Sequence, residues 1–291
     1  MKIATACYPL DMLSSWAQYE DKIARWVDEA DADLLVFPEY GAMELATLAG
    51  LETAKDLEAS AQAVSDRIPE ADALHRRLAQ ETGKHILAAS APVVPSPGAR
   101  PVNRARLFAP SGAMGEQDKQ IMTRFEAEVW DIVPGGPLQL FETALGKIGI
   151  LICYDSEFPL LGRALSEADI LLVPSVTEAL SGYTRVHIGA RARALENQCV
   201  SVMSSVTGSA VWSEALDTST GAGGIYGPPD KGFPQNGVLA QGAINEPGWT
   251  VAEVDISAIA DVRADGTVLN RRHWPQQEPR CAPAHAISMT T

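Results

Sequence analysis

The chain has 291 residues, of which 46% are hydrophobic and 21% charged, proportions typical of globular proteins with a sizeable core. Its formal net charge of −14 argues against nucleic-acid binding, because affinity for phosphates comes mainly from lysine and arginine. No stretch approaches the roughly 20 apolar residues of a membrane span, and the first residues lack the apolar core of a signal peptide. We therefore expect a cytoplasmic protein with neither nucleic-acid nor membrane partners.

The predicted elements alternate between strand and helix along the chain. Short, almost continuously apolar runs, typical of strands covered on both faces, occupy residues 3–7, 34–37, 85–89, 148–152, 170–173 and 200–204. Segments with helical spacing of apolar residues occupy 16–30, 56–79, 160–168 and 188–198. Pro69 is expected to divide the second of these segments into two helices. Strands that alternate with helices predict a layered α/β fold.

Two segments are less regular. Residues 93–106 (VVPSPGARPVNRAR) are rich in proline and predict an exposed connection. Residues 221–237 (GAGGIYGPPDKGFPQNG) predict a long loop, and loops of this length are usually functional or disordered. Neither segment has the character of a linker, and no internal repeat is present, so we expect one domain.

The cysteines are far apart in the chain, at Cys7, Cys153, Cys199 and Cys281. There is no CxxC pair and no histidine at metal-ligand spacing, which argues against a zinc site. Four dispersed cysteines in a chain of this length do not indicate a disulfide framework, so a reducing compartment fits better.

Three short segments of the sequence each contain one chemically reactive side chain. These are LLVFPEY with Glu39, QDKQIMTRFEAEVW with Lys119, and KIGILICYDSEFP with Cys153. Taken singly, each has an ordinary interpretation, namely a solvated loop glutamate, a surface lysine and a buried structural cysteine. Taken together, they combine a general base, a cation and a nucleophile, and ligands usually bind outside the carboxyl ends of strands in α/β sheets. A thiol needs such help because its unperturbed pKa is about 8.5.

In this combination and order the sequence resembles the nitrilase superfamily of carbon–nitrogen hydrolases. PEY is similar to the glutamate motif, DKQIMTRFEAEVWDIVPGG to the lysine segment, and GKIGILICYDSEFPLLGRAL to the nucleophile segment. ILLVPS, RARALENQ and GPPDKGFPQNGVLAQG resemble the segments that follow in the family. The resemblance implies a four-layer αββα sandwich over residues 1–275 and commonly a homodimer or larger assembly. Residues 276–291 would form a C-terminal tail, at a subunit interface or disordered.

The resemblance also implies a role for each matching residue. Glu39 would be the general base, Cys153 the nucleophile that carries a thioester, and Lys119 an oxyanion donor together with the backbone N–H of Tyr154. No metal ion or organic cofactor is required for this chemistry.

The family often has a second glutamate after the lysine, and we expect Glu126 in that position, with Glu128 as the alternative. Asp155 and Arg163 are expected to hold the loop after the nucleophile. Residues in or beside the motifs that could line the substrate pocket, or instead pack in the core, are Tyr154, Phe125, Trp130, Thr177 and Tyr183.

The sequence therefore predicts an amide hydrolase that acts on a small linear amide or N-carbamoyl compound and water. Nitrilases that act on nitriles often have tryptophan beside the cysteine, whereas this chain has Tyr154, which fits the amidase branches better. A nitrilase remains the first alternative. The second alternative is a non-catalytic scaffold that keeps the fold for protein–protein interaction.

Overall fold

Thirteen strands make up the sheet of the computed structural model, which describes residues 1–290, and helices connect the parallel strands while turns and loops connect most of the others. The strands are β1 (Lys2–Pro9), β2 (Leu34–Val36), β3 (His85–Val93), β4 (Val102–Phe108), β5 (Met114–Asp118), β6 (Leu140–Thr143), β7 (Gly146–Ile150), β8 (Ile170–Ser175), β9 (Val200–Ser209), β10 (Thr218–Ser219), β11 (Gly224–Tyr226), β12 (Val238–Gln241) and β13 (Gly248–Glu253).

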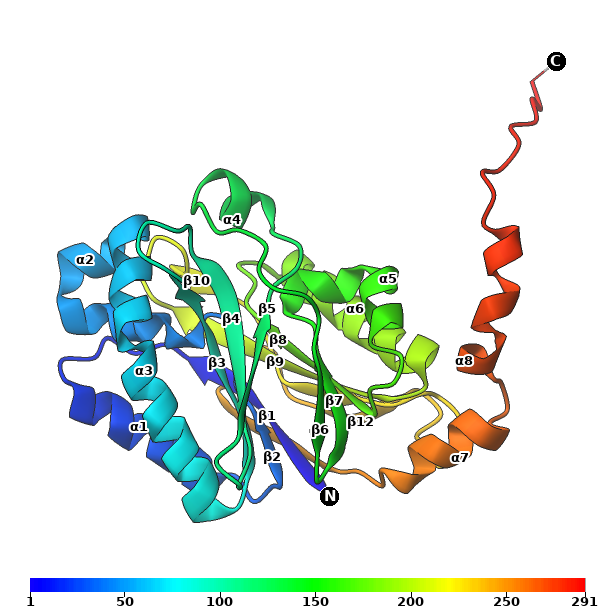
Figure 1. Cartoon of the computed structure of the whole chain (residues 1–291), viewed down its shortest axis with the longest axis horizontal. Helices are drawn as coiled ribbons and strands as arrows, with labels where there is room; N and C mark the ends of the chain where they lie inside the picture. Colours follow the sequence, from blue (N-terminus) through cyan, green and yellow to red (C-terminus); the bar gives the residue numbers. More distant parts are fainter. Residues whose placement is uncertain (291) are drawn as a thin grey trace.

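The helices lie outside the sheet (Figure 1). They are α1 (Trp16–Glu29), α2 (Leu51–Lys55), α3 (Leu57–Thr82), α4 (Arg124–Glu128), α5 (Pro159–Ala164), α6 (Leu180–Asn197), α7 (Ser257–Asp265) and α8 (Asn270–His273). Short 3₁₀ segments are η1 (Gly41–Ala49), η2 (Cys153–Glu157), η3 (Trp274–Gln276) and η4 (Glu278–Arg280). None of the helices within residues 1–290 is both long and apolar enough to cross a membrane.

The main path of the sheet runs β5-β4-β3-β2-β1-β9-β8-β7-β6. The six strands from β3 to β7 along this path are parallel to one another, and the outer neighbours are antiparallel. Strand β1 pairs with β2 and β13 along its first part and with β9 along its last residues, so it joins the two halves of the sheet. The carboxyl ends of β2, β7 and β8 consequently lie on the same side of the molecule.

Alternate residues of each central strand enter two different cores. On β1, Ala4 and Ala6 pack in the core beneath α1 and α3, whereas Ile3 packs in a second core with Ile148 of β7 and Ile170 of β8. The second core lies between the two halves of the sheet, and α5 and α6 cover the far half. Both faces of the strands are therefore buried, which explains their continuously apolar sequences. This arrangement confirms the predicted αββα sandwich.

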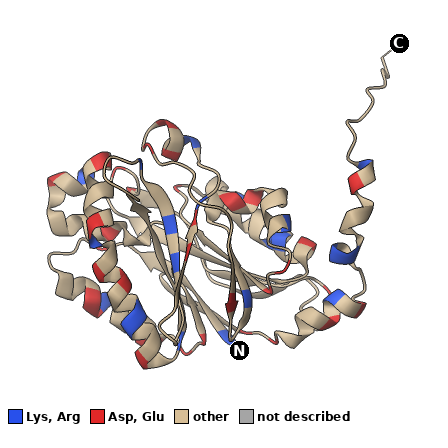
Figure 2. Cartoon of the chain, in the orientation of Figure 1, with Lys and Arg blue, Asp and Glu red and all other residues tan. Residues whose placement is uncertain are grey.

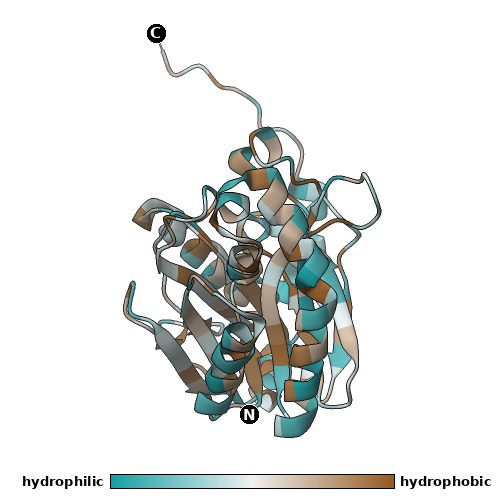
Figure 3. Cartoon of the chain, turned by 90° about the vertical axis from the view of Figure 1, so that its left-hand side faces the viewer, coloured by the Kyte–Doolittle hydropathy of each residue, from teal (hydrophilic) through white to brown (hydrophobic). Residues whose placement is uncertain are grey.

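The outer helices are amphipathic, with polar faces toward solvent and apolar faces toward the strands (Figure 3). Acidic and basic residues are interspersed along α1 and α3 (Figure 2). After α7 the chain continues through α8, η3 and η4 and then extends away from the body of the molecule (Figure 1). Residue 291, the last of the predicted tail, lies outside the described residues.

Helix α3 differs from the sequence prediction because it continues through Pro69. Proline lacks the N–H that a helix interior uses and disfavours the helix there by about 3 kcal/mol. On both sides of Pro69, however, apolar side chains of α3 are buried, including Val64 and Ile68 before it and Ala71 and Leu74 after it. Packing on both flanks therefore keeps one helix where the local sequence favours two.

Two predicted loops also contain buried strands. The last residues of 93–106 belong to β4, in which Asn103 and Arg106 are almost completely buried. Within 221–237, β11 pairs with both β9 and β12. Gly223 lies so close to the backbone of Thr5 that a Cβ atom would be 2.8 Å from that carbonyl oxygen. The glycines that suggested a loop thus permit close packing of backbones. Helix α6 likewise begins at Leu180, eight residues before its predicted start at 188.

Candidate active site

Cys153 is the first residue of η2 and lies just after the end of β7. Its φ of 49° is in the left-handed region, which is unfavourable for a residue with a side chain. The Ser156 hydroxyl donates a hydrogen bond of 2.7 Å to the Cys153 carbonyl oxygen and so stabilises this sharp turn. The thiol is 5% exposed, and its Sγ lies 3.7 Å from the carbonyl oxygen of Val176.

Asp155 joins the cysteine turn to the lysine segment. Its carboxylate accepts backbone hydrogen bonds from Ile121 at 2.8 Å, and from Gln120 and Ile152 at 3.2 Å each. Burial raises the pKa of Asp155 to about 7. Asp155 therefore holds the nucleophile loop as predicted. Arg163 does not, because its guanidinium contacts Glu278 and stacks over the Trp274 ring.

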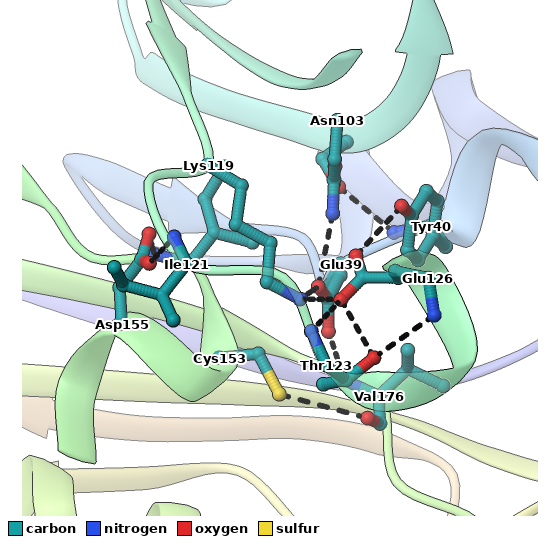
Figure 4. Close-up of polar contacts among 12 residues, drawn as sticks. Glu39, Tyr40, Asn103, Lys119, Ile121, Thr123, Glu126, Cys153, Asp155 and Val176 are labelled. Carbon is teal, nitrogen blue, oxygen red and sulfur yellow. Dashed lines mark hydrogen bonds and ion pairs between the residues drawn. The ribbon is translucent and has the colours of Figure 1, made fainter. Parts of the chain in front are cut away.

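Lys119 follows β5 and is almost completely buried. Its backbone N–H donates to Asn103 O at 2.9 Å, which extends the pairing of β4 and β5 by one residue. Its Nζ lies 2.7 Å from Glu39 Oε1 and 2.6 Å from Glu126 Oε2 (Figure 4). Burial alone would lower the pKa of Lys119, but the two carboxylates outweigh it and raise the pKa. The ammonium is therefore charged.

Glu39 follows β2 and Pro38, and donors occupy both of its carboxylate oxygens. Besides Lys119, Oε1 accepts from Asn103 Nδ2 at 2.9 Å, and Oε2 accepts from the backbone N–H of Val176 at 3.0 Å. Burial raises the pKa of Glu39, the neighbouring Glu126 raises it further, and Lys119 opposes both. The carboxylate is thus fixed in orientation, and its raised pKa makes it a stronger base.

The second glutamate that contacts Lys119 is Glu126 of α4. Thr123 caps this helix, since its hydroxyl oxygen accepts from the backbone N–H of Glu126 at 3.3 Å and its own backbone N–H donates to Glu126 Oε2 at 2.9 Å. The Thr123 hydroxyl also donates to Oε2 at 2.8 Å, and Tyr40 OH donates to Oε1 at 2.8 Å. Burial alone would raise the pKa of Glu126, but Lys119 and Thr123 lower it below the usual value. Glu128 is instead paired with Arg124 at the surface. Between the two glutamates, the structure therefore brings Glu126 to the lysine.

Sequence reasoning did not single out the residues that orient these carboxylates. Asn103 lies on β4, inside a segment interpreted as a loop, and its Oδ1 accepts a 2.6 Å hydrogen bond from Ser90 Oγ. Ser90 in turn accepts from the backbone N–H of Tyr40 at 2.9 Å, where β3 has an irregular register. Only Thr123 had a local signal, because TRFE has the spacing of a capping box.

Electrostatics at this site favour a neutral thiol before substrate binds. Burial raises the pKa of the Cys153 thiol well above its usual range, and the negative Glu39 adds to the rise more than Lys119 offsets it. A single ammonium beside a thiol would favour the thiolate. In the structure two carboxylates already surround that ammonium, so a thiolate would add a second excess negative charge.

A cavity of about 300 Å³ opens onto these groups. Glu39, Lys119, Glu126 and Cys153 lie at its base, and the predicted pocket residues that line it are Phe125, Trp130 and Thr177. Tyr154 lines an adjoining cavity of about 240 Å³ that also reaches Cys153.

Tyr183, the remaining predicted pocket residue, lines neither of the two cavities that reach Cys153. It is buried on α6, where its ring stacks on His187 with the ring centroids 5.7 Å apart. For Tyr183 the pocket prediction was therefore wrong, and its alternative, core packing, holds.

The chain belongs to the carbon–nitrogen hydrolase family, because the family model described as "Carbon-nitrogen hydrolase" matches residues 3–264. The probable hydrolase YhcX of Bacillus subtilis is 30% identical over 273 residues, which cover 92% of this chain and 52% of YhcX. The chain thus spans about half the length of that relative.

Solved structures share the fold. Nit3 of Saccharomyces cerevisiae, a member of branch 10 of the nitrilase superfamily, is similar with a TM-score of 0.69, 20% identity and 97% coverage of both chains. A mutant of the amidase from Nesterenkonia sp. AN1, which shows Michael addition of acrylamide at the active-site cysteine, is similar with a TM-score of 0.63. Its identity is 23%, over 94% of this chain and 99% of that one. The predicted membership of the carbon–nitrogen hydrolase family is therefore confirmed, and the solved structures share its fold.

Proposed function

We propose that the protein hydrolyses a small linear amide or N-carbamoyl compound through a thioester on Cys153. The observation that carries this proposal is the meeting of Glu39, Lys119 and Cys153 at the base of one cavity, with the Glu39 carboxylate held by three donors. The amidase from Nesterenkonia, which has a related fold and an active-site cysteine, supports the same chemistry.

In the first half of the reaction, Cys153 Sγ attacks the carbonyl carbon while Glu39 accepts the thiol proton. Lys119 Nζ and the backbone N–H of Tyr154 stabilise the negative oxygen of the tetrahedral intermediate. Each such donor typically contributes about 3–4 kcal/mol to the transition state. Glu39 then gives its proton to the leaving nitrogen, the C–N bond breaks, and ammonia or an amine departs from the thioester.

In the second half, Glu39 accepts a proton from water as the water oxygen attacks the thioester carbon. The intermediate collapses, the C–S bond breaks, and Glu39 returns the proton to the sulfur, so the products are a carboxylic acid and the free thiol. The raised pKa of Glu39 suits a group that both takes and gives this proton. The neutral thiol fits transfer during attack rather than before it.

The test is an assay of ammonia release from parallel panels of linear amides, N-carbamoyl compounds and nitriles. Wild-type protein should turn over members of the amide panel, of the N-carbamoyl panel or of both, and Cys153→Ala should abolish turnover while circular dichroism and the unfolding midpoint stay close to wild type. Turnover of nitriles alone would support the nitrilase alternative. A fully active Cys153→Ala protein would refute the proposal.

A separate measurement addresses the scaffold alternative. Iodoacetamide should alkylate Cys153 faster than the buried Cys199, because Cys153 lines the cavity and Glu39 can accept its proton as the sulfur attacks; peptide mapping after intact-mass measurement distinguishes the two cysteines. If Cys153 reacts no faster than Cys199, the residue has no special nucleophilicity and a non-catalytic role is favoured.

We also propose that the protein forms a homodimer or larger assembly in a reducing compartment such as the cytoplasm, with residues 276–291 at or near a subunit contact. Leu160 on α5 is 75% exposed and Ile188 on α6 is 62% exposed, which supports burial of this face by another copy. Analytical ultracentrifugation should give the mass of a dimer or larger assembly for the wild type and a smaller mass for Ile188→Glu, which places a charge on this face.

A further inference from the structure

The mouth of the 300 Å³ cavity is acidic. Glu178, which follows β8, and Glu214 and Asp217, in the loop between β9 and β10, line the cavity in addition to the groups at its base. All three are exposed, and within residues 1–290 none of their carboxylates forms an ion pair or accepts a hydrogen bond. These three carboxylates can therefore interact directly with a ligand that enters the cavity.

No cation of the protein compensates these charges inside the cavity. Lys119 is the only lysine or arginine among the lining residues of the described chain, and Glu39 and Glu126 already surround its ammonium. In the adjoining cavity, Arg185 lies 3.3 Å from Glu157, so its charge is balanced there. The field at the mouth is therefore negative, as is the formal net charge of −14 of the whole chain.

An aromatic wall gives an independent indication of the same ligand chemistry. Tyr40, Phe125 and Trp130 line the cavity, with ring centroids 4.6 Å apart for Tyr40 and Trp130 and 6.1 Å apart for Phe125 and Trp130. Tyr40 and Trp130 are 2% and 4% exposed, whereas Phe125 is 37% exposed, so Phe125 is the ring most open to a ligand. The faces of aromatic rings attract ammonium and guanidinium groups and have no such attraction for carboxylates.

We infer that the substrate is a linear amide with a positively charged group, an ammonium or a guanidinium, at the end remote from the reacting carbon. This inference rests on the proposed function, since it takes Cys153 as the point at which the amide reacts. The amide carbon lies at the base of the cavity, and the charged end lies toward Glu178, Glu214 and Asp217. An anionic end would be repelled at the same place.

The experiment compares three amides of similar length that differ in charge, namely 5-aminopentanamide, hexanamide and glutaramate. Wild-type protein should show a kcat/KM at least tenfold higher for 5-aminopentanamide than for hexanamide, and lowest for glutaramate. The preference should shrink as sodium chloride is raised, because these carboxylates are exposed and salt screens them. Equal or higher activity on hexanamide or glutaramate would overturn the inference.

The double variant Glu214→Gln/Asp217→Asn identifies the residues responsible. It should reduce the preference for 5-aminopentanamide over hexanamide, measured as the ratio of the two kcat/KM values, at least tenfold. The matched control is Glu142→Gln, an exposed acid on β6 outside both cavities, which should leave the preference unchanged. An unchanged preference in the double variant would refute the assignment of these acids.

Binding to Cys153→Ala separates this inference from the proposed function, because binding requires no turnover. In isothermal titration calorimetry, 5-aminopentanamide should bind Cys153→Ala at least tenfold more tightly than hexanamide. If the wild type turns over no amide yet this difference is found, the proposed reaction fails and the inference on charge stands. If amides are hydrolysed but bind without regard to charge, the reaction stands and the inference fails.

Discussion

Replacement of Lys119 by methionine tests the charge balance of the site most directly. The substitution keeps a long apolar stem but removes the ammonium from between Glu39 and Glu126, which lie 2.7 and 2.6 Å from Nζ. Both carboxyls are at most 3% exposed, so solvation compensates for only a small part of the lost cation. Removing one partner of a buried ion pair costs about 3–5 kcal/mol, a large part of the roughly 5–15 kcal/mol that stabilises a typical protein.

The sign of the pH dependence follows from linkage. Without Lys119, both carboxyls keep their protons at higher pH in the folded state than in the unfolded state, where they titrate near 4.5. The folded state then binds more protons, so the free energy of unfolding falls as pH rises above about 4.5. The slope is about 1.4 kcal/mol per pH unit for each carboxyl that stays protonated.

Guanidinium unfolding curves of wild type and Lys119→Met at pH 5 and pH 7 measure this effect. The variant should be strongly destabilised at pH 7 and closer to wild type at pH 5, and its turnover should fall at least about 100-fold, as typically follows loss of one oxyanion donor. The double variant Lys119→Met/Glu126→Gln, with one carboxyl fewer, should regain stability at pH 7. Equal destabilisation at both pH values, or none, would refute the reasoning.

Three further predictions concern the groups around this centre. Glu126→Gln removes a negative charge that raises the pKa of Glu39, so the acidic limb of the kcat/KM profile should move to lower pH; a limb that stays in place would contradict the assignment of Glu39 as base. Burial raises the folded-state pKa of Asp155 to about 7, so the free energy of unfolding of the wild type should fall as pH rises from about 4 to 7. Asp155→Asn should make this fall smaller, and urea unfolding over this pH range measures it. Tyr40→Phe removes the donor to Glu126 Oε1 and should cost about 1–3 kcal/mol, measured by unfolding at pH 7 with no change in the slope against denaturant.

Local patterns were sufficient to predict a layered α/β fold, whereas the four-layer αββα sandwich followed from the resemblance to the nitrilase superfamily. The continuously apolar sequences of the central strands indicate that both faces of these strands are buried. This indication does not depend on the order of the strands in the sheet. The predictions that failed concern segments whose local preference opposes their packing. Proline at position 69 and the glycines of 221–237 favour breaks and loops, but buried contacts outside those segments override that preference.

The candidate site divides in the same way. Cys153 was predicted to be the nucleophile because its continuous motif, in order with the segments of Glu39 and Lys119, resembles the nitrilase superfamily. The contact between Lys119 and Glu39 joins residues 80 positions apart, and the hydrogen bond of Asn103 to Glu39 joins residues 64 apart. Contacts of that kind leave no periodic trace in the sequence, and the prolines before Asn103 led to its assignment to an exposed connection.

By itself, the sequence determined the layered fold and the residue types that could react, because both depend on patterns within a few neighbouring positions. Only the tertiary structure decided which glutamate meets Lys119, that the Cys153 thiol is neutral, and that Tyr183 is packed away from the cavity. The physical reason is that protonation, orientation and pocket lining depend on burial and on charges brought together from distant segments. Neither burial nor those charges is a property of the local sequence.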